Sequence, residues 1–260
     1  MVKEFSSFFK SKVAVVFGVA NKDSIAFSIA KNLYENDCKL VIVYQDRIED
    51  LVKKTCKNFK NTEFIPCDVT QENQLDNLFK IIKKKYKKID HIVHSIAFAK
   101  KEDLEHQFIE TTAHNYALAQ HVSAYSLVEI SRRALPLMKK DSSIITMSFQ
   151  GSERVFKNYN VMGVCKATLE ANVKYLAKDL GERGIRINAI SAGPIPTRAA
   201  MAIKEFSNML NAWETQSLLK RNISQQEVAN TAMFLLSKLS SGITGDVIHV
   251  DSGFHNVGYQ

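Results

Sequence analysis

The chain has 260 residues, which is long enough to bury a large core, and its composition is that of a globular protein. Hydrophobic residues make up 45% and charged residues 24% of it, which excludes disordered and collagen-like classes. No apolar run approaches the roughly 20 residues that span a bilayer, so we expect no membrane segment. The net charge is +8. Because no nucleic-acid motif accompanies that charge, we expect no nucleic-acid partner.

The cysteines and histidines predict neither disulfides nor a metal site. The four cysteines are scattered without CxxC pairing, which is typical of reduced thiols in a cytoplasmic protein. The seven histidines show no ligand spacing. We therefore assign no metal.

Apolar runs of strand length alternate with segments of helical period along the whole chain. The runs 40–44 and 187–190 are nearly continuous, as expected for parallel strands covered on both faces. The pattern predicts a single α/β domain over 1–260, with a doubly wound, Rossmann-type sheet of about seven parallel strands and helices on both faces. The expected strands lie near 13–17, 39–44, 62–66, 89–94, 143–148, 185–190 and 246–250.

The connection after the first expected strand has features of a pyrophosphate-binding turn. Gly18 follows the strand, and a helix is expected to begin near Ser24 and Ile25. Gly18 can supply the tight turn, and Ser24 can cap the helix and donate to a phosphate. Only one glycine of the usual GxGxxG pattern is present, so an ordinary strand–helix connection is an equal alternative.

The ends of the second and third strands carry candidate contacts to an adenosine. Gln45 lies 27 positions after Gly18, where an acidic residue favours NAD and arginine favours NADP. Gln45 is neutral and Arg47 is near, and we expect NADH. Asp68, beside Val69, can accept from an adenine amino group. The equal alternative is a loop aspartate that caps the next helix.

The end of the fourth strand is small and uncharged. Ser95 and Ile96 open this stretch and Ala99 closes it, so a cofactor can pass close to the backbone at Ser95 and Ile96, with substrate near Ala99. We expect His94, just before them, to be a packed, hydrogen-bonded histidine rather than a catalytic group.

A turn after the sixth strand exposes backbone groups beside the sheet. Gly193 and Pro194 favour this turn. We expect Gly193, Ile195 and Thr197 to contact the cofactor. The following segment, 196–212, is apolar, and its pattern fits either core or a movable lid. We expect a substrate-binding lid. Its proposed contacts to substrate are Ala199, Ile203 and Phe206.

Tyr159 and Lys166 are the most informative pair in the chain. They stand seven residues apart, which is two turns of a helix, so both side chains would project from one face with Met162 between them. Just past the carboxyl end of a strand, a phenol and an ammonium can hold a cofactor sugar and a developing oxyanion. The alternative is an ordinary helix with a surface tyrosine and lysine.

Together these segments resemble the short-chain dehydrogenase/reductase superfamily, and most closely its divergent bacterial branch of NADH-dependent enoyl-acyl-carrier-protein reductases. The resemblance covers essentially the whole chain. It is carried by the segments 18–26, 158–172, 188–195 and 245–254. Ordinary members have Tyr-x3-Lys, and Met162 occupies that tyrosine position here. The spacing Tyr-x6-Lys is typical of the branch.

The resemblance implies a reaction and roles for the pair. Tyr159 donates a hydrogen bond to the enolate oxygen, Lys166 binds the nicotinamide ribose, and solvent protonates the α-carbon. In conjugate reduction the charge appears three bonds from the carbon that accepts hydride. A phenol moved by one helical turn, about 5.4 Å, suits that more distant oxygen. The implied partners are an acyl carrier protein bearing the enoyl thioester and other copies of the chain in a homotetramer.

Three departures from the family pattern are present, and rival functions stay open. Phe149 stands where the family commonly has a second tyrosine, and Ala97 stands where glycine is usual. Pro196 and Arg198 replace residues that are often basic and apolar respectively. Phe149 is placed against substrate with Met162. A short-chain carbonyl or hydroxy dehydrogenase is one rival, and Met162 argues against it. A catalytically weakened NAD-binding paralogue is a second, suggested by Phe149, and a basic nucleic-acid-binding domain is a third, motivated only by charge.

Two further expectations concern surfaces. Apolar or small residues off the main stripe of the expected helix 159–181 predict burial against another subunit; they are Val161, Val164, Cys165 and Thr168. For carrier docking we favour Arg198 and Lys204 over the lysine run 80–88, because that run lies near the amino edge of the fourth strand, away from the expected site.

Overall fold

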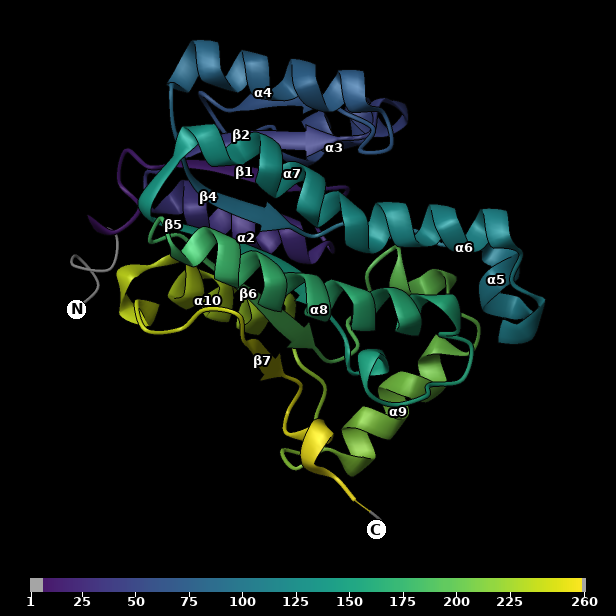
Figure 1. Ribbon diagram of the computed structural model, residues 1–260. Helices are drawn as coiled ribbons and strands as arrows, with labels where there is room; N and C mark the ends of the chain where they lie inside the picture. The colour runs from purple at the N-terminus through teal and green to yellow at the C-terminus, as the bar shows by residue number, and fades with distance from the viewer. Residues whose placement is uncertain (1–6, 259–260) are drawn as a thin grey trace.

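The computed structural model describes residues 7–258, which form one seven-stranded sheet with helices on both faces (Figure 1). The strand order is β3-β2-β1-β4-β5-β6-β7, and every neighbouring pair is parallel. This order confirms the predicted doubly wound fold. The strands are β1 (Val13–Phe17), β2 (Lys39–Tyr44), β3 (Glu63–Pro66), β4 (Ile89–His94), β5 (Met138–Ser148), β6 (Arg186–Ala192) and β7 (Val247–Val250).

Strand β5 begins five residues earlier than the apolar pattern predicts. Its register to β4 shifts between the pairs Ile89–Met138 and His91–Ser143, and Asp141 in the added stretch has a φ of 71°. The stretch is polar and mostly exposed, so no hydrophobic signal marks it as strand.

Helices cover both faces of the sheet, and the core residues of each face identify them. One face is covered by α2 (Ile25–Glu35), α3 (Glu49–Thr55) and α10 (Gln225–Leu236). The other is covered by α4 (Glu72–Tyr86), α7 (Ser126–Ala134) and α8 (Val161–Gly181). In Figure 1, α5 (Lys101–Glu105) and α9 (Phe206–Gln216) lie beyond the carboxyl ends of the strands. Next to α5, α6 (Ala113–Gln120) continues through a π-helical turn (His121–Tyr125) into α7. The 3₁₀ turns are Asp46–Ile48, Phe108–Glu110, Leu135–Leu137, Gln150–Ser152, Ala200–Ala202, Lys238–Ser240 and Phe254–Asn256.

The alternation of side chains along the strands explains why both faces need a cover. In β1, Ala14 and Val16 belong to the core under α2 and α10, while Val15 and Phe17 belong to the core under α4 and α7. A strand with apolar residues at every position is stable only when both faces are buried.

A capping box marks the start of α10. The Ser224 hydroxyl accepts from the Glu227 N–H, and the Glu227 carboxylate accepts from the Ser224 N–H. These bonds satisfy helix-end donors that would otherwise be unpaired. They fix where α10 begins.

The strand order reverses between β1 and β4, which opens a crevice at their carboxyl ends. The Ser95 N–H donates to the Phe17 carbonyl at 3.2 Å just past both strands. In open α/β sheets, ligands bind at this switch point.

Within residues 7–258 no helix is long and apolar enough to cross a membrane. The same residues hold no group of three or more His, Cys, Asp or Glu side chains placed to bind a metal ion.

Candidate active site

A cavity of about 560 Å³ occupies the crevice at the carboxyl edge of the sheet. The structure brings almost all of the residues proposed from sequence to its wall. Those proposed for the cofactor are Gly18, Ser24, Ile25, Gln45, Val69, Ser95, Ile96, Lys166, Gly193, Ile195 and Thr197. Those proposed for substrate or catalysis are Ala99, Phe149, Tyr159, Met162, Ala199, Ile203 and Phe206. Their separate roles remain predictions.

Gly18 forms a turn that no other residue fits. Its φ is 100°, and a Cβ built on it would lie 1.9 Å from the Ser95 carbonyl oxygen. Side chains other than hydrogen are therefore excluded by both backbone conformation and space. The turn leads directly into α2, whose first residue, Ile25, lines the cavity. A bare backbone at a helix N-terminus fits the pyrophosphate of a dinucleotide.

Ser24 shapes this turn differently from the expectation. Its hydroxyl accepts from the N–H groups of Ala20 and Asn21 and donates to the Asn21 carbonyl. It makes no capping bond to α2, so the predicted cap is wrong. The hydroxyl is turned back to the loop because the loop's own N–H groups also need acceptors.

The end of β2 presents Gln45 and Arg47 to the cavity. The Arg47 Nε donates to the Gln45 Oε1 at 3.0 Å, and both residues line the wall. This bond uses one of the five guanidinium N–H groups and leaves the terminal ones free.

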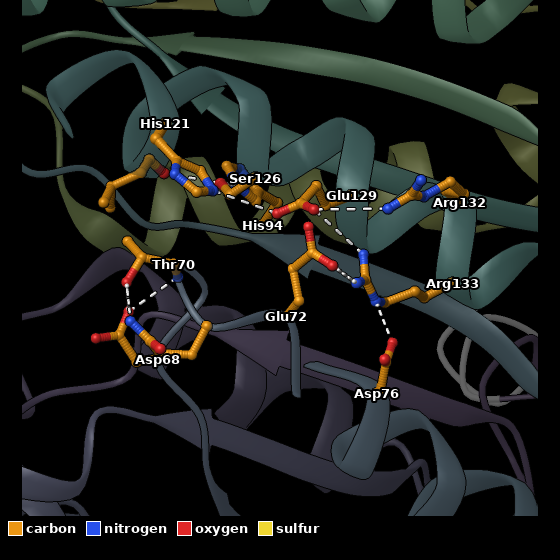
Figure 2. Close-up of polar contacts among 12 residues, drawn as sticks. Asp68, Thr70, Glu72, Asp76, His94, His121, Ser126, Glu129, Arg132 and Arg133 are labelled. Atoms are coloured by element: carbon orange, nitrogen blue, oxygen red, sulfur yellow. Dashed lines mark hydrogen bonds and ion pairs between the residues drawn. The ribbon is translucent and has the colours of Figure 1, made fainter. Parts of the chain in front are cut away.

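Asp68 is the one proposed residue that does not line the cavity, although its neighbours Cys67 and Val69 do. Its Oδ1 accepts from the N–H and the hydroxyl of Thr70, at 2.9 and 2.8 Å (Figure 2). These bonds are those of a loop aspartate that orders a turn. Thr70 precedes the N-cap of α4, Gln71, and α4 has no side-chain cap, so Asp68 orders the loop without capping the helix. An adenine contact stays a prediction.

Lys166 is buried on α8 with its ammonium group held in place. Its side chain is 6% exposed, and Nζ donates to the Met147 carbonyl at 2.7 Å. Burial lowers the pKa of Lys166 to about 8, against smaller opposing effects of Cys165 and Glu170. The two other N–H bonds of the ammonium are available to a cofactor sugar.

Tyr159 does not lie on the helix, contrary to the expectation from its spacing to Lys166. α8 begins at Val161, and Asn160 before it has φ 42° and ψ −120°, which no helical residue adopts. Tyr159 and Lys166 nevertheless line the same cavity. The Tyr159 side chain is 8% exposed, and burial raises the pKa of its phenol, so the proton stays on the oxygen at neutral pH.

Phe149 belongs to an aromatic cluster that packs against the tyrosine. Its ring meets Tyr159 edge-on at 4.8 Å between centroids, and Phe156 and Trp213 lie at 5.0 and 5.9 Å. Phe149 also lines the cavity. Because Phe149 has no hydroxyl, Tyr159 supplies the phenol of this aromatic pair.

Sequence reasoning missed Ser148 and Glu170. Ser148 ends β5 and lines the cavity, and its hydroxyl donates to the buried Glu170 carboxylate on α8. The position of Ser148 at a strand end was an available signal. The position of Glu170, one helical turn after Lys166, was another.

His94 is a packed histidine, as predicted. Its ring nitrogens contact the Thr146 and Ser126 hydroxyls, each at 2.8 Å, and burial lowers its pKa to about 3.

Figure 2 shows His94 beside a network in which Arg133 of α7 bridges to Asp76 of α4 at 2.7 Å and contacts the buried Glu129. This network joins the two helices that cover β4.

The fold and the cavity define a dinucleotide-binding oxidoreductase of the α/β class. A family model described as "Enoyl-(Acyl carrier protein) reductase" matches residues 18–255. The chain belongs to this family.

Individual relatives match over nearly the whole chain. The enoyl-[acyl-carrier-protein] reductase [NADH] of Bacillus cereus is 45% identical over 252 residues, 96% of this chain and 98% of the relative. The [NADPH] enzyme of Staphylococcus aureus is 46% identical over 251 residues, 95% of this chain and 98% of the relative. The crystal structure of the Anaplasma phagocytophilum reductase in complex with NAD matches with a TM-score of 0.93 and 39% identity, over 97% of each chain.

Proposed function

We propose that this protein is an NADH-dependent enoyl-acyl-carrier-protein reductase of fatty-acid elongation, which reduces the α,β double bond of trans-2-enoyl thioesters. The observation that carries the proposal is one cavity that joins the Gly18 turn, Lys166 and Tyr159. Met162, at the position where ordinary superfamily members have their tyrosine, lines the same wall without a proton donor. That argues against the carbonyl dehydrogenase.

The chain's residues have separable tasks in this reaction. The cofactor, when bound, supplies a hydride to the β-carbon. Lys166 holds the ribose hydroxyls with the two ammonium N–H bonds that Met147 leaves free. Tyr159 donates to the thioester oxygen, whose negative charge grows as the enolate forms, in a site lined by Phe149, Met162 and Phe206. Solvent then protonates the α-carbon.

NADH consumption with crotonyl-CoA and with an enoyl-acyl carrier protein tests the function. We expect the absorbance of NADH to fall with either substrate, and faster than with NADPH, because Gln45 at the end of β2 carries no positive charge to pair with a 2′-phosphate. No consumption of either nucleotide with both substrates would refute the proposal.

The segment 196–212 is proposed as a substrate lid. Phe206 is buried and lines the cavity, whereas Met201 is 61% exposed, so part of its apolar surface lacks a cover. We expect hydrogen exchange in 196–212 to slow when NADH and an acyl mimic bind, because closure would bury that surface. Equal exchange with and without ligands would rule out a lid.

Carrier docking is proposed at Arg198 and Lys204. Arg198 lines the mouth of the cavity, and Lys204 lies beside Ile203 in the lid. An acidic carrier would be steered to this charge. Lys204→Glu should raise KM for the enoyl-acyl carrier protein about tenfold and leave KM for crotonyl-CoA nearly unchanged. Lys84→Glu, in the lysine run of α4, is the control. A larger rise in KM for the enoyl-acyl carrier protein in this variant would show that the carrier docks at the lysine run instead.

A homotetramer is proposed, on part of the surface expected. Val161 and Cys165 are fully buried inside the subunit, whereas Val164 and Thr168 are half-buried and remain available to a partner. Three exposed aromatic residues lie on α6, the π-helical turn and α8, and these elements contact one another, so the residues offer a second apolar surface. They are Tyr116, Tyr125 and Tyr175. Light scattering should give about four times the 29.3 kDa chain mass. A mass of one chain at micromolar concentration would contradict this.

The location proposed is the cytoplasm. Cys38, Cys56, Cys67 and Cys165 are all buried free thiols, as is usual in a reducing compartment.

A further inference from the structure

The backbone on both sides of Tyr159 adopts conformations that are rare outside glycine. Asn158 has a φ of 64° and Asn160 a φ of 42°. Asparagine tolerates positive φ better than most residues, yet two such positions around one side chain are uncommon. Strain of this kind persists only where surrounding contacts enforce it. The contacts of the two asparagine amides show what enforces it here.

The Asn160 amide ties the start of α8 to α5. Nδ2 donates to the Asp103 carbonyl at 3.1 Å and to the His106 carbonyl at 2.8 Å. An asparagine at a helix N-cap ordinarily uses its side chain to accept from the helix's own N–H groups, and Asn160 makes no such bond. Leu104, beside Asp103, lines the cavity. The amide therefore holds one wall of the cavity against the backbone of Tyr159.

The Asn158 amide ties the other side of Tyr159 to the proposed lid. Nδ2 donates to the Lys204 carbonyl at 2.8 Å, and the neighbouring Lys157 pairs with Glu205 at 2.9 Å. Phe206, which follows, is buried and lines the cavity. Asn158 therefore connects the backbone beside the tyrosine to the segment that carries Lys204 and Phe206.

The ring of Tyr159 has little freedom between these anchors. A Cβ on Gly151 would lie 2.5 Å from the tyrosine Cδ1. The Phe149 ring contacts the tyrosine ring edge-on, at 4.8 Å between centroids. Within the described residues 7–258 the phenol oxygen forms no hydrogen bond. Its position is thus set by packing and by the backbone that the two asparagines hold.

We infer that Asn158 and Asn160 form an asparagine bracket of positioning residues, which sets the Tyr159 phenol relative to the cavity and couples it to the lid. The inference rests on the proposed function. Because the two amides bind different walls, they have different effects. Asn160 fixes where the phenol meets the thioester oxygen, and Asn158 transmits the closure of 196–212 to the tyrosine.

Glycine variants test the bracket because glycine accepts positive φ, so each change removes the amide without adding backbone strain. Asn160→Gly should lower kcat for crotonyl-CoA about tenfold to a hundredfold through misplacement of the phenol, with KM for NADH within about twofold. Asn158→Gly should instead raise KM for crotonyl-CoA about fivefold. It should also speed hydrogen exchange in 204–210. Asn61→Gly is the matched control, because exposed Asn61 has a φ of 58° in the loop before β3, and it should leave both parameters unchanged.

Exchange at the start of α8 supplies a readout that needs no activity. The N–H groups of Met162 and Gly163 donate to the carbonyls of Tyr159 and Asn160, and both should exchange faster in Asn160→Gly than in Asn61→Gly. Asn160→Asp, which also tolerates positive φ but lacks the donor, should reproduce the loss of kcat if the glycine variant does not fold.

The outcomes separate the two proposals. A wild-type protein that reduces no enoyl thioester refutes the function, and the exchange measurements still decide the bracket. An active wild type with full kcat and unchanged exchange in Asn160→Gly overturns the bracket. A loss of kcat matched by equal losses of NADH affinity and thermal stability also overturns it, because general unfolding would then be the cause.

Discussion

Tyr159→Phe should lower kcat for crotonyl-CoA about a hundredfold, since removal of one oxyanion donor costs roughly 10²–10³ in rate. KM should change little, because the lost hydrogen bond strengthens only as charge develops on the thioester oxygen. The aromatic cluster with Phe149 keeps the phenylalanine ring in place, so folding should be unaffected. Steady-state kinetics with NADH in excess measure the change.

A matched substitution makes this result specific. Tyr86→Phe removes a phenol from the end of α4, away from the cavity, and should leave kcat unchanged. Equal kcat in wild type and Tyr159→Phe would show that another group stabilises the enolate, and Ser148 at the same wall is then the first candidate.

Lys166→Ala should weaken NADH binding about tenfold to a hundredfold, because hydrogen bonds to a charged group contribute about 1.5–3 kcal/mol. The change also leaves the buried Met147 carbonyl without its partner. Fluorescence titration measures the affinity. Lys174→Ala, an exposed position on the same helix, is the control. Unchanged NADH affinity in Lys166→Ala would mean that the ribose is held elsewhere.

The lowered pKa of Lys166 gives this prediction a pH dependence. An amine is half protonated at its pKa, so the ammonium predominates below about pH 8 and is lost as pH rises through that value. NADH affinity of the wild type should therefore fall as pH rises from about 7 to about 9. His94, with a pKa of about 3, and Cys165, with a pKa raised by burial to about 11, keep their charge states there. A flat profile in Lys166→Ala assigns the change to this lysine.

Much of the cavity wall could be predicted because strand ends in a parallel sheet meet at one edge. Gly18, Gln45, Ser95 and Gly193 each follow a strand, and all line the cavity. Asp68 shares that sequence signal, yet its carboxylate is bonded to Thr70. Whether a strand-end side chain enters the crevice or orders its own loop depends on local donors that the pattern does not show.

The sequence by itself determined which segments form strands, which residues stand at the carboxyl ends of those strands, and the family. These follow from hydrophobic periodicity and motif spacing, which are local properties. Only the tertiary structure decided how Tyr159 is held. Its spacing to Lys166 fits a helical face, but α8 begins after it, at Val161. The bonds that hold its flanking asparagines run to His106 and Lys204, far away along the chain, and only folding brings those carbonyls within reach.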